Sequence, residues 1–248
     1  AVLDPKFWVG GNYYQEDYRS EFSAQNIGSR MTPEEHFAIY RDLNERQFAQ
    51  FAHHLTQDTH YFEIGCSFGG VLKQVADFGV ATCHGIEPNK EDAEFVQNIC
   101  PEARIFNSTF EDLDVKKEYY EMVTSFEALE HTVSPRNILH KAASAMKKNG
   151  LINIEVPNHR DPLLSCYENI AYEKFYYHKA HIHYFTKDSF TQLINSHGFK
   201  VVASQYNTKM WGGAWLIAFT KGDESSSNQA LNEKTNEIFT YAIYYIIS

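Results

Sequence analysis

Apolar and polar positions alternate along the middle of the chain in a repeating strand and helix pattern. Short apolar runs of strand length are separated by amphipathic stretches with helical spacing. Candidate strands are 60–64, 81–86, 103–106, 121–126 and 150–156, and candidate helices are 69–79, 90–99 and 135–147. This alternation is typical of an α/β fold with a mostly parallel, Rossmann-like sheet covered by helices on both faces.

A helix is predicted before the first strand. Thr32 is a suitable N-cap, Pro33 suits the first helical position, and Glu35 completes a capping box. Aromatic residues at helical spacing extend this prediction to about Leu55.

The end of the pattern predicts one more helix and two strands. The helix begins at Thr186 and ends before Gly198, a good C-terminal breaker. Apolar runs at 199–205 and 214–219 then supply strands that could finish the sheet.

We therefore expect three parts. An N-terminal arm and capping helix occupy 1–56, and the main domain occupies 57–222 with an aromatic, histidine-rich lid insertion at 157–185. A polar linker and a C-terminal helix follow at 223–248. The last segment is apolar on part of its surface, which is consistent with a further domain or an oligomer contact beyond Ser248.

Composition narrows the class of protein. Apolar residues make up 43% of the 248 residues, enough for a sizeable core, and the net charge of −10 disfavours nucleic acid as a partner. No apolar run reaches the length of a membrane span, and the first residues lack the pattern of a signal peptide. Four cysteines without CxxC spacing favour reduced thiols and a cytoplasmic location.

The stretch His60-Tyr-Phe-Glu-Ile-Gly-Cys-Ser-Phe-Gly-Gly-Val71 indicates a nucleotide-binding turn between a strand and a helix. Gly65 and Gly69 allow a tight turn and a close approach to a ligand. Glu87 follows Gly65 by 22 residues (87 minus 65), the spacing expected for an acid that accepts hydrogen bonds from ribose hydroxyls.

The same turn favours one class of nucleotide over another. A dinucleotide site expects a second glycine in the register of Ser67, and the acidic Glu63 would sit badly beside a pyrophosphate. A carboxylate there suits a ligand that carries an ammonium group and a sulfonium. An NAD-dependent oxidoreductase is therefore the alternative, and a non-catalytic nucleotide-binding module is a third hypothesis.

At these residues the chain resembles the class I S-adenosylmethionine-dependent methyltransferases. Glu63, Gly65 and Gly69 match their first motif, with Ser67 in place of its middle glycine. The segments Asn107–Leu113, Ser125–His131 and His183–Phe190 match later motifs in the same order, the second of them ending in Leu-Glu-His. The resemblance covers about residues 50–220.

The resemblance implies S-adenosylmethionine as the cofactor and methyl transfer to a small molecule as the activity, and relatives methylate quinones, amines and natural products as well as sugars. The implied cofactor-binding residues are Glu63, Gly65, Cys66, Gly69, Glu87, Pro88, Thr109, Phe110, Ser125 and Phe126.

Histidine is the natural base for a hydroxyl acceptor, because its pKa lies near neutrality. His131 follows the fourth strand, at the sheet edge where open α/β folds bind ligands. We favour it narrowly over His181 and His183, and a structural role in holding the loop is nearly as good an interpretation. The run His178, His181 and His183 also suggests a metal, but no carboxylate or thiol stands at ligand spacing nearby, so no metal is expected.

Tyrosines suit the walls of an acceptor pocket, because each combines a flat apolar face with a hydroxyl. The candidates are Tyr13, Tyr14, Tyr18, Tyr176 and Tyr177. Together these features predict a methyltransferase that acts on a small polar acceptor, such as a hydroxyl of a sugar or glycan intermediate. This makes carbohydrate modification its expected role.

Overall fold

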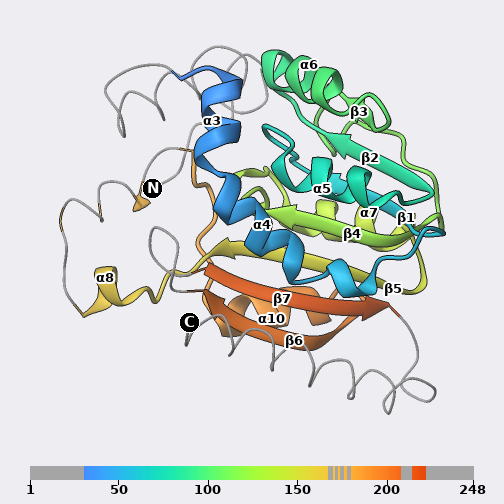
Figure 1. Ribbon diagram of the computed structural model, residues 1–248. Helices are drawn as coiled ribbons and strands as arrows, with labels where there is room; N and C mark the ends of the chain where they lie inside the picture. The colour runs from blue at the N-terminus through green and yellow to red at the C-terminus, as the bar shows by residue number, and fades with distance from the viewer. Residues whose placement is uncertain are drawn as a thin grey trace.

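The computed structural model describes residues 31–166, 170, 173, 176–177, 180–207 and 214–221. A seven-stranded sheet forms its centre (Figure 1). The strands are β1 His60–Ile64, β2 Thr82–Ile86, β3 Arg104–Phe106, β4 Tyr120–Phe126, β5 Met146–Pro157, β6 Phe199–Asn207 and β7 Ala214–Lys221. Residues 1–30 of the predicted arm lie outside the described residues, and with them Tyr13, Tyr14 and Tyr18. The predicted linker and C-terminal helix at 223–248 also lie outside them. The division into three parts therefore stays a prediction.

The strand order is β3-β2-β1-β4-β5-β7-β6. The first five of these strands pair in parallel, and β7 runs antiparallel to both β5 and β6. The expected Rossmann-like, mostly parallel sheet is thus confirmed. The order reverses direction between β1 and β4, and this is the switch point at which such sheets bind their ligands.

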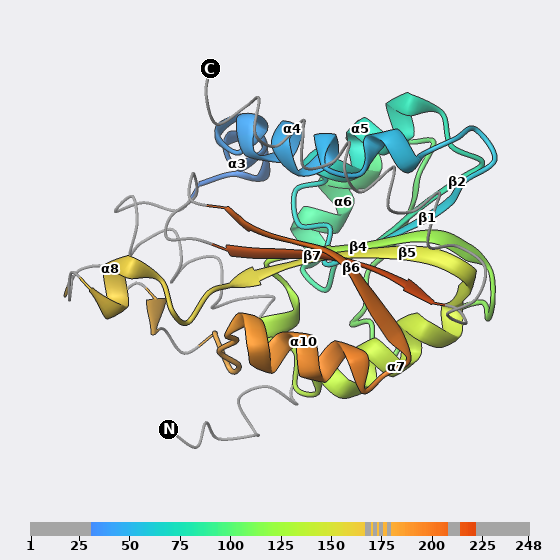
Figure 2. The ribbon, with the colours of Figure 1, turned by 90° about the horizontal axis from the view of Figure 1, so that it is seen from below.

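Helices cover both faces of the sheet (Figure 2). The described helices are α3 Pro33–Ile39, α4 Arg41–Ala49, η2 Ala52–His54, α5 Gly70–Phe78, α6 Lys90–Ile99, η3 Leu129–His131, α7 Pro135–Ala145, α8 Pro162–Ser165 and α10 Lys187–Asn195. Helices α3, α4, α5 and α6 lie on one face, and α7 and α10 lie on the other. None of the helices within the described residues combines the length and the apolar character that a membrane crossing requires.

Side-chain alternation along β1 explains the two cores. Tyr61 is fully buried among residues of α5 and α6, whereas its neighbour Phe62 is buried among residues of α7 and α10. Successive residues of a strand point to opposite faces, so both faces of β1 need apolar side chains. Glu63 shares the Tyr61 face, and this places a carboxylate inside the core that α4 and α5 cover.

The N-terminal helix begins as predicted but does not continue to Leu55. Thr32 accepts from the Glu35 amide, and the Glu35 carboxylate accepts from the Thr32 amide, so the capping box is confirmed. The helix then breaks at Tyr40 into α3 and α4. The two halves pack on different partners, since Phe37 of α3 meets Phe95 of α6 edge to face while α4 lies against α5. One straight helix could not reach both.

Candidate functional site

The loop between β1 and α5 adopts the tight turn that its glycines predict. Gly65 and Gly69 both have φ of 74°, in the left-handed region that favours glycine. A Cβ at Gly69 would lie 2.7 Å from the Val96 side chain, and one at Gly65 would lie 2.7 Å from the Cβ of Ala128. The second contact shows that the loop after β1 touches the loop after β4.

Ser67, which stands where related motifs carry glycine, also has a left-handed backbone, with φ of 47°. Its amide donates to Glu87 Oε2 at 2.9 Å, so the strained residue is held by the acid at the tip of β2. A non-glycine residue in this conformation costs on the order of 1 kcal/mol. The loop therefore keeps the backbone conformation expected for glycine, although serine stands at this position.

We therefore expect Ser67→Gly to raise the free energy of unfolding by roughly 0.5–1 kcal/mol, because it relieves the left-handed strain. Urea denaturation measures the change. Ser144→Gly, in the interior of α7, is the matched control and should lower stability by about 0.5 kcal/mol. Equal losses from both substitutions would show that Ser67 carries no strain.

Glu87 organises the tip of β2. Its side chain is 6% exposed, and its Oε1 accepts from the Asn89 amide at 2.8 Å while Oε2 holds Ser67. Asn107 donates its side-chain amide to the carbonyls of Glu87 and Pro88, tying the end of β3 to the end of β2. The sequence motif Asn107–Leu113 contains this residue, but the motif alone does not predict the contact.

Glu63 is a buried carboxylate with 3% exposure. Tyr61 donates its hydroxyl hydrogen bond toward Glu63 Oε2 at 3.2 Å, and the same hydroxyl contacts Thr124 Oγ1 at 2.5 Å. Burial raises the pKa of Glu63 to about 8, and the hydrogen bond from Tyr61 opposes this rise. The group is poised to lose its proton when a cationic ligand binds nearby.

Two of the other predicted cofactor residues make structural contacts of their own. Thr109 donates its hydroxyl to Asp112 at 2.6 Å, and Phe110 is 5% exposed and packs against Phe62 in the core. Cys66 belongs to the loop between β1 and α5 and is buried, and this burial raises the pKa of its thiol. Their contacts with a cofactor stay a prediction.

The end of β4 supplies the remaining two predicted cofactor residues. Ser125 is 1% exposed, and within the described residues its hydroxyl has no hydrogen-bond partner. Phe126 is half-buried and stacks on Phe51. A buried hydroxyl without a partner is costly unless something else at the site supplies one.

Three glutamates gather at the carboxyl ends of β4 and β5, with Glu127 and Glu130 after β4 and Glu155 near the end of β5. Glu130 and Glu155 are fully buried, and Glu127 is half-buried with a left-handed φ of 48°. Burial raises the pKa of Glu127 well above its usual range, with the charges of Glu130 and Glu155 adding to the rise. Burial also raises the pKa of Glu130 to about 8 and that of Glu155 to about 7. Three ionisable carboxyl groups in one buried region favour the binding of a cation there.

Sequence signals for these acids were present. Glu127 and Glu130 precede His131 in the segment Ser125–His131, and Glu155 is the charged residue of the predicted strand 150–156. A charged residue in a buried strand is rarely tolerated without a partner or a ligand.

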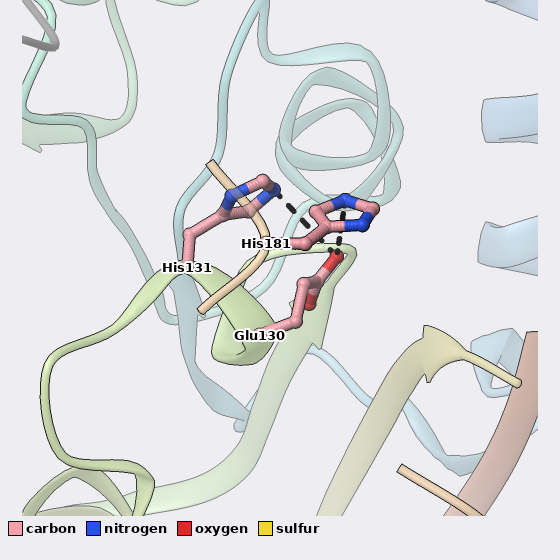
Figure 3. A group of neighbouring side chains, drawn as sticks. All are labelled: Glu130, His131 and His181. Carbon is pink, nitrogen blue, oxygen red and sulfur yellow. Dashed lines mark ion pairs between the residues drawn. The ribbon is translucent and has the colours of Figure 1, made fainter. Parts of the chain in front are cut away.

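The structure brings His131 and His181 together around Glu130 (Figure 3). The rings of the two histidines lie 4.9 Å apart between centroids. The Nε2 atoms of His131 and His181 lie 3.6 Å and 4.0 Å from Glu130 Oε1, and each histidine side chain is about one-tenth exposed. The run His178–His183 has no carboxylate at ligand spacing in the sequence, but the fold brings Glu130 to His181 from a distant part of the chain.

His183 is separate from this group. Its amide donates to the Glu130 carbonyl, as does the amide of Ile182, but its ring stacks on Phe185. The main chain of His183 therefore anchors the segment that carries His181, while the His183 ring contacts Phe185.

Tyr176 and Tyr177 form an aromatic group with His159 and Tyr184, in which the ring centroids of neighbours lie 5.2–6.3 Å apart. Tyr176 is 2% exposed, whereas Tyr177 is 44% exposed. The ring of Tyr176 also meets that of His181 at 6.0 Å, so this group adjoins the histidine pair.

Comparison with known proteins identifies the kind of domain. A family model described as a methyltransferase domain matches residues 34–204, more than half of the chain. No curated protein sequence matches the chain significantly.

Several solved structures share the fold. A magnesium protoporphyrin IX methyltransferase from Synechocystis, solved with bound S-adenosylmethionine, has a TM-score of 0.62 at 11% identity and covers 90% of this chain and 99% of its own. An S-adenosylmethionine-dependent enzyme from Thermotoga maritima, described as a possible histamine N-methyltransferase, has a TM-score of 0.58 at 17% identity, covering 82% and 100%. A methyltransferase from Haloferax volcanii, in complex with its Trm112 activator, scores 0.61 at 14% identity, covering 84% and 100%. At identities of 11–17% the likeness shows a common fold alone.

Proposed function

The chain belongs to the class I S-adenosylmethionine-dependent methyltransferases, and we propose that it transfers a methyl group to a hydroxyl of a small polar acceptor, a sugar or a glycan intermediate. The contact between Gly65 and Ala128 carries this proposal. It sets the loop after β1 directly beside the loop that holds Glu130 and His131. A methyl donor on the first loop would therefore face titratable side chains on the second.

The residues present fit S-adenosylmethionine. Glu87 accepts main-chain hydrogen bonds from Ser67 and Asn89, and because a carboxylate oxygen accepts more than one hydrogen bond, the group suits a ribose hydroxyl as well. Glu63 and the three glutamates at the ends of β4 and β5 can ionise to balance a cationic ligand, whereas ionised carboxylates would repel a pyrophosphate. The NAD alternative is disfavoured on the same grounds, and the family match favours an enzyme over a binding module.

S-adenosylmethionine supplies an electrophilic methyl group that an acceptor oxygen displaces in line, leaving S-adenosylhomocysteine and a proton. The protein has to orient the acceptor and take that proton. His131 and His181 each turn Nε2 toward Glu130, which can stabilise an imidazolium once a proton arrives. His131 is our first candidate for the base, because it follows β4 directly.

The aromatic group supports a sugar acceptor. Tyr177 offers an exposed ring, and Tyr176 connects this ring to His181. A flat apolar face with a hydroxyl at its rim suits the apolar face and polar edge of a sugar ring. The thiols of Cys66, Cys83 and Cys100 are unpaired, which supports the proposed cytoplasmic setting.

An acceptor screen tests the proposal. The full chain is incubated with methyl-labelled S-adenosylmethionine and sets of sugars, nucleotide sugars, amines and quinones. We expect label on a sugar hydroxyl, and we expect His131→Ala to lower kcat by about 10²–10⁴-fold while the affinity for S-adenosylhomocysteine stays unchanged.

His140→Ala, an exposed histidine on α7, is the matched control and should keep full activity. Label found solely on amines or quinones would contradict the sugar assignment. Undiminished turnover in His131→Ala would move the base to another residue.

A further inference from the structure

The side chains of Glu130, His131 and His181 converge on a common point (Figure 3). One ligand atom from each, two imidazole nitrogens and a carboxylate oxygen, lie within 4.8 Å of one another. Glu130 and His131 come from η3, directly after β4, and His181 comes from a segment 50 residues later.

The backbone locks the two halves of this group together. The amides of Ile182 and His183 both donate to the carbonyl of Glu130, at 3.0 Å and 3.1 Å. The segment that carries His181 is therefore held by the same residue whose carboxylate it faces. Preorganisation of this kind is what a ligand set requires before its ligand arrives.

Hydrogen bonds to the main chain orient both imidazole rings. His131 Nδ1 lies 2.8 Å from the Ala180 carbonyl, and His181 Nδ1 lies 3.1 Å from the Tyr176 carbonyl. A carbonyl only accepts, so both Nδ1 atoms carry the hydrogen and donate. In each neutral ring Nε2 then carries the lone pair. Both Nε2 atoms lie on the side of the ring that faces Glu130. Histidines that bind metals show the same arrangement, with the second ring N–H donated to a carbonyl.

Glu130 needs a positive partner. It is fully buried, and within the described residues neither of its carboxylate oxygens has a hydrogen-bond partner. The separations of 3.6 Å and 4.0 Å from the two Nε2 atoms exceed the length of a good hydrogen bond. A buried carboxylate without hydrogen bonds costs several kcal/mol unless a charge compensates it.

We infer that Glu130, His131 and His181 bind a divalent first-row transition-metal ion through one carboxylate oxygen and two Nε2 atoms. Metal–ligand bonds of about 2.0–2.2 Å place neighbouring ligand atoms roughly 3–4 Å apart, which the two measured separations match. Imidazole donors favour ions such as Zn²⁺ or Co²⁺ over Mg²⁺.

This inference deepens the proposed function and rests on it for the ion's role. Three protein ligands leave coordination positions open, which is the pattern of catalytic rather than structural sites. A cation there lowers the pKa of an acceptor hydroxyl beside the cofactor loop. His131 is then a ligand, and the ion replaces a free imidazole as the activating group.

A metal titration tests the site without any acceptor. The full chain is dialysed against a chelator and titrated with Co²⁺, whose visible absorption reports nitrogen and oxygen coordination, and Zn²⁺ is then added as a competitor. We expect one ion per chain, displaced by Zn²⁺, and a loss of affinity of roughly a hundredfold or more in Glu130→Gln and His181→Ala.

The exposed residues Glu94 and His140 provide matched controls, and Glu94→Gln and His140→Ala should bind as the wild type does. Glu130→Gln keeps the side-chain size and removes a buried ionisable group, so it should stay folded by circular dichroism. Absence of a Co²⁺ spectrum, or equal affinity in Glu130→Gln, overturns the inference. Full-rate methyl transfer by the metal-free chain would contradict only the role of the metal. Stoichiometric Co²⁺ binding without methyl transfer to any acceptor would contradict only the proposed function.

Discussion

Glu87→Ala should weaken the binding of S-adenosylhomocysteine by at least about a hundredfold. The carboxylate is expected to accept hydrogen bonds from both ribose hydroxyls, and a hydrogen bond to a charged group contributes about 1.5–3 kcal/mol. The same carboxylate holds the amides of Ser67 and Asn89, so its loss also loosens the cofactor loop. Isothermal titration calorimetry with S-adenosylhomocysteine measures the effect.

Glu94→Ala removes the same charge from an exposed position on α6 and should bind normally. Thermal unfolding of both variants shows whether the fold survives. If folded Glu87→Ala binds within about threefold of the wild type, the ribose assignment is wrong.

Glu63 should make the stability of the ligand-free protein depend on pH. Its pKa is about 8 in the fold against an ordinary value of 4.5 in the unfolded chain. Between these values the folded state holds a proton that the unfolded state has lost. Stability is therefore full below pH 4.5, falls as the pH rises toward 8, and levels off above that. The difference corresponds to roughly 4–5 kcal/mol as an upper limit.

Glu63→Gln removes this titration and keeps an acceptor for the Tyr61 hydroxyl. The free energy of unfolding of this variant, minus that of the wild type, should be several kcal/mol larger at pH 8.5 than at pH 4.5. Urea unfolding at a series of pH values measures the slope. Glu94→Gln, on the surface, should follow the wild type. A Glu63→Gln variant with an unchanged slope would show that this carboxyl is ionised in the fold.

Much of the fold was predictable because its signals are local. The apolar runs marked every strand of the sheet, and the Thr32 capping box and the Gly198 breaker marked helix ends. The cofactor class also followed from local chemistry, since Glu63 in the first motif favours a cationic ligand.

The break at Tyr40 could not be predicted, because no glycine or proline signals it. It follows from the positions of α5 and α6, on which the two halves of the helix pack. Phe110 illustrates the same limit, since the motif marks it as a cofactor neighbour while its ring fills the core against Phe62.

Local patterns predict the α/β architecture, the glycine turn and the acid at the tip of β2, because each depends on residues close together in the chain. The surroundings of His131 depend instead on contacts between distant segments. Residues 130 and 181 meet because the Glu130 carbonyl accepts the amides that follow His181, and the Glu130 side chain is buried there. Long-range hydrogen bonding, which no local pattern encodes, thus brought His181 of the histidine run to Glu130 and His131.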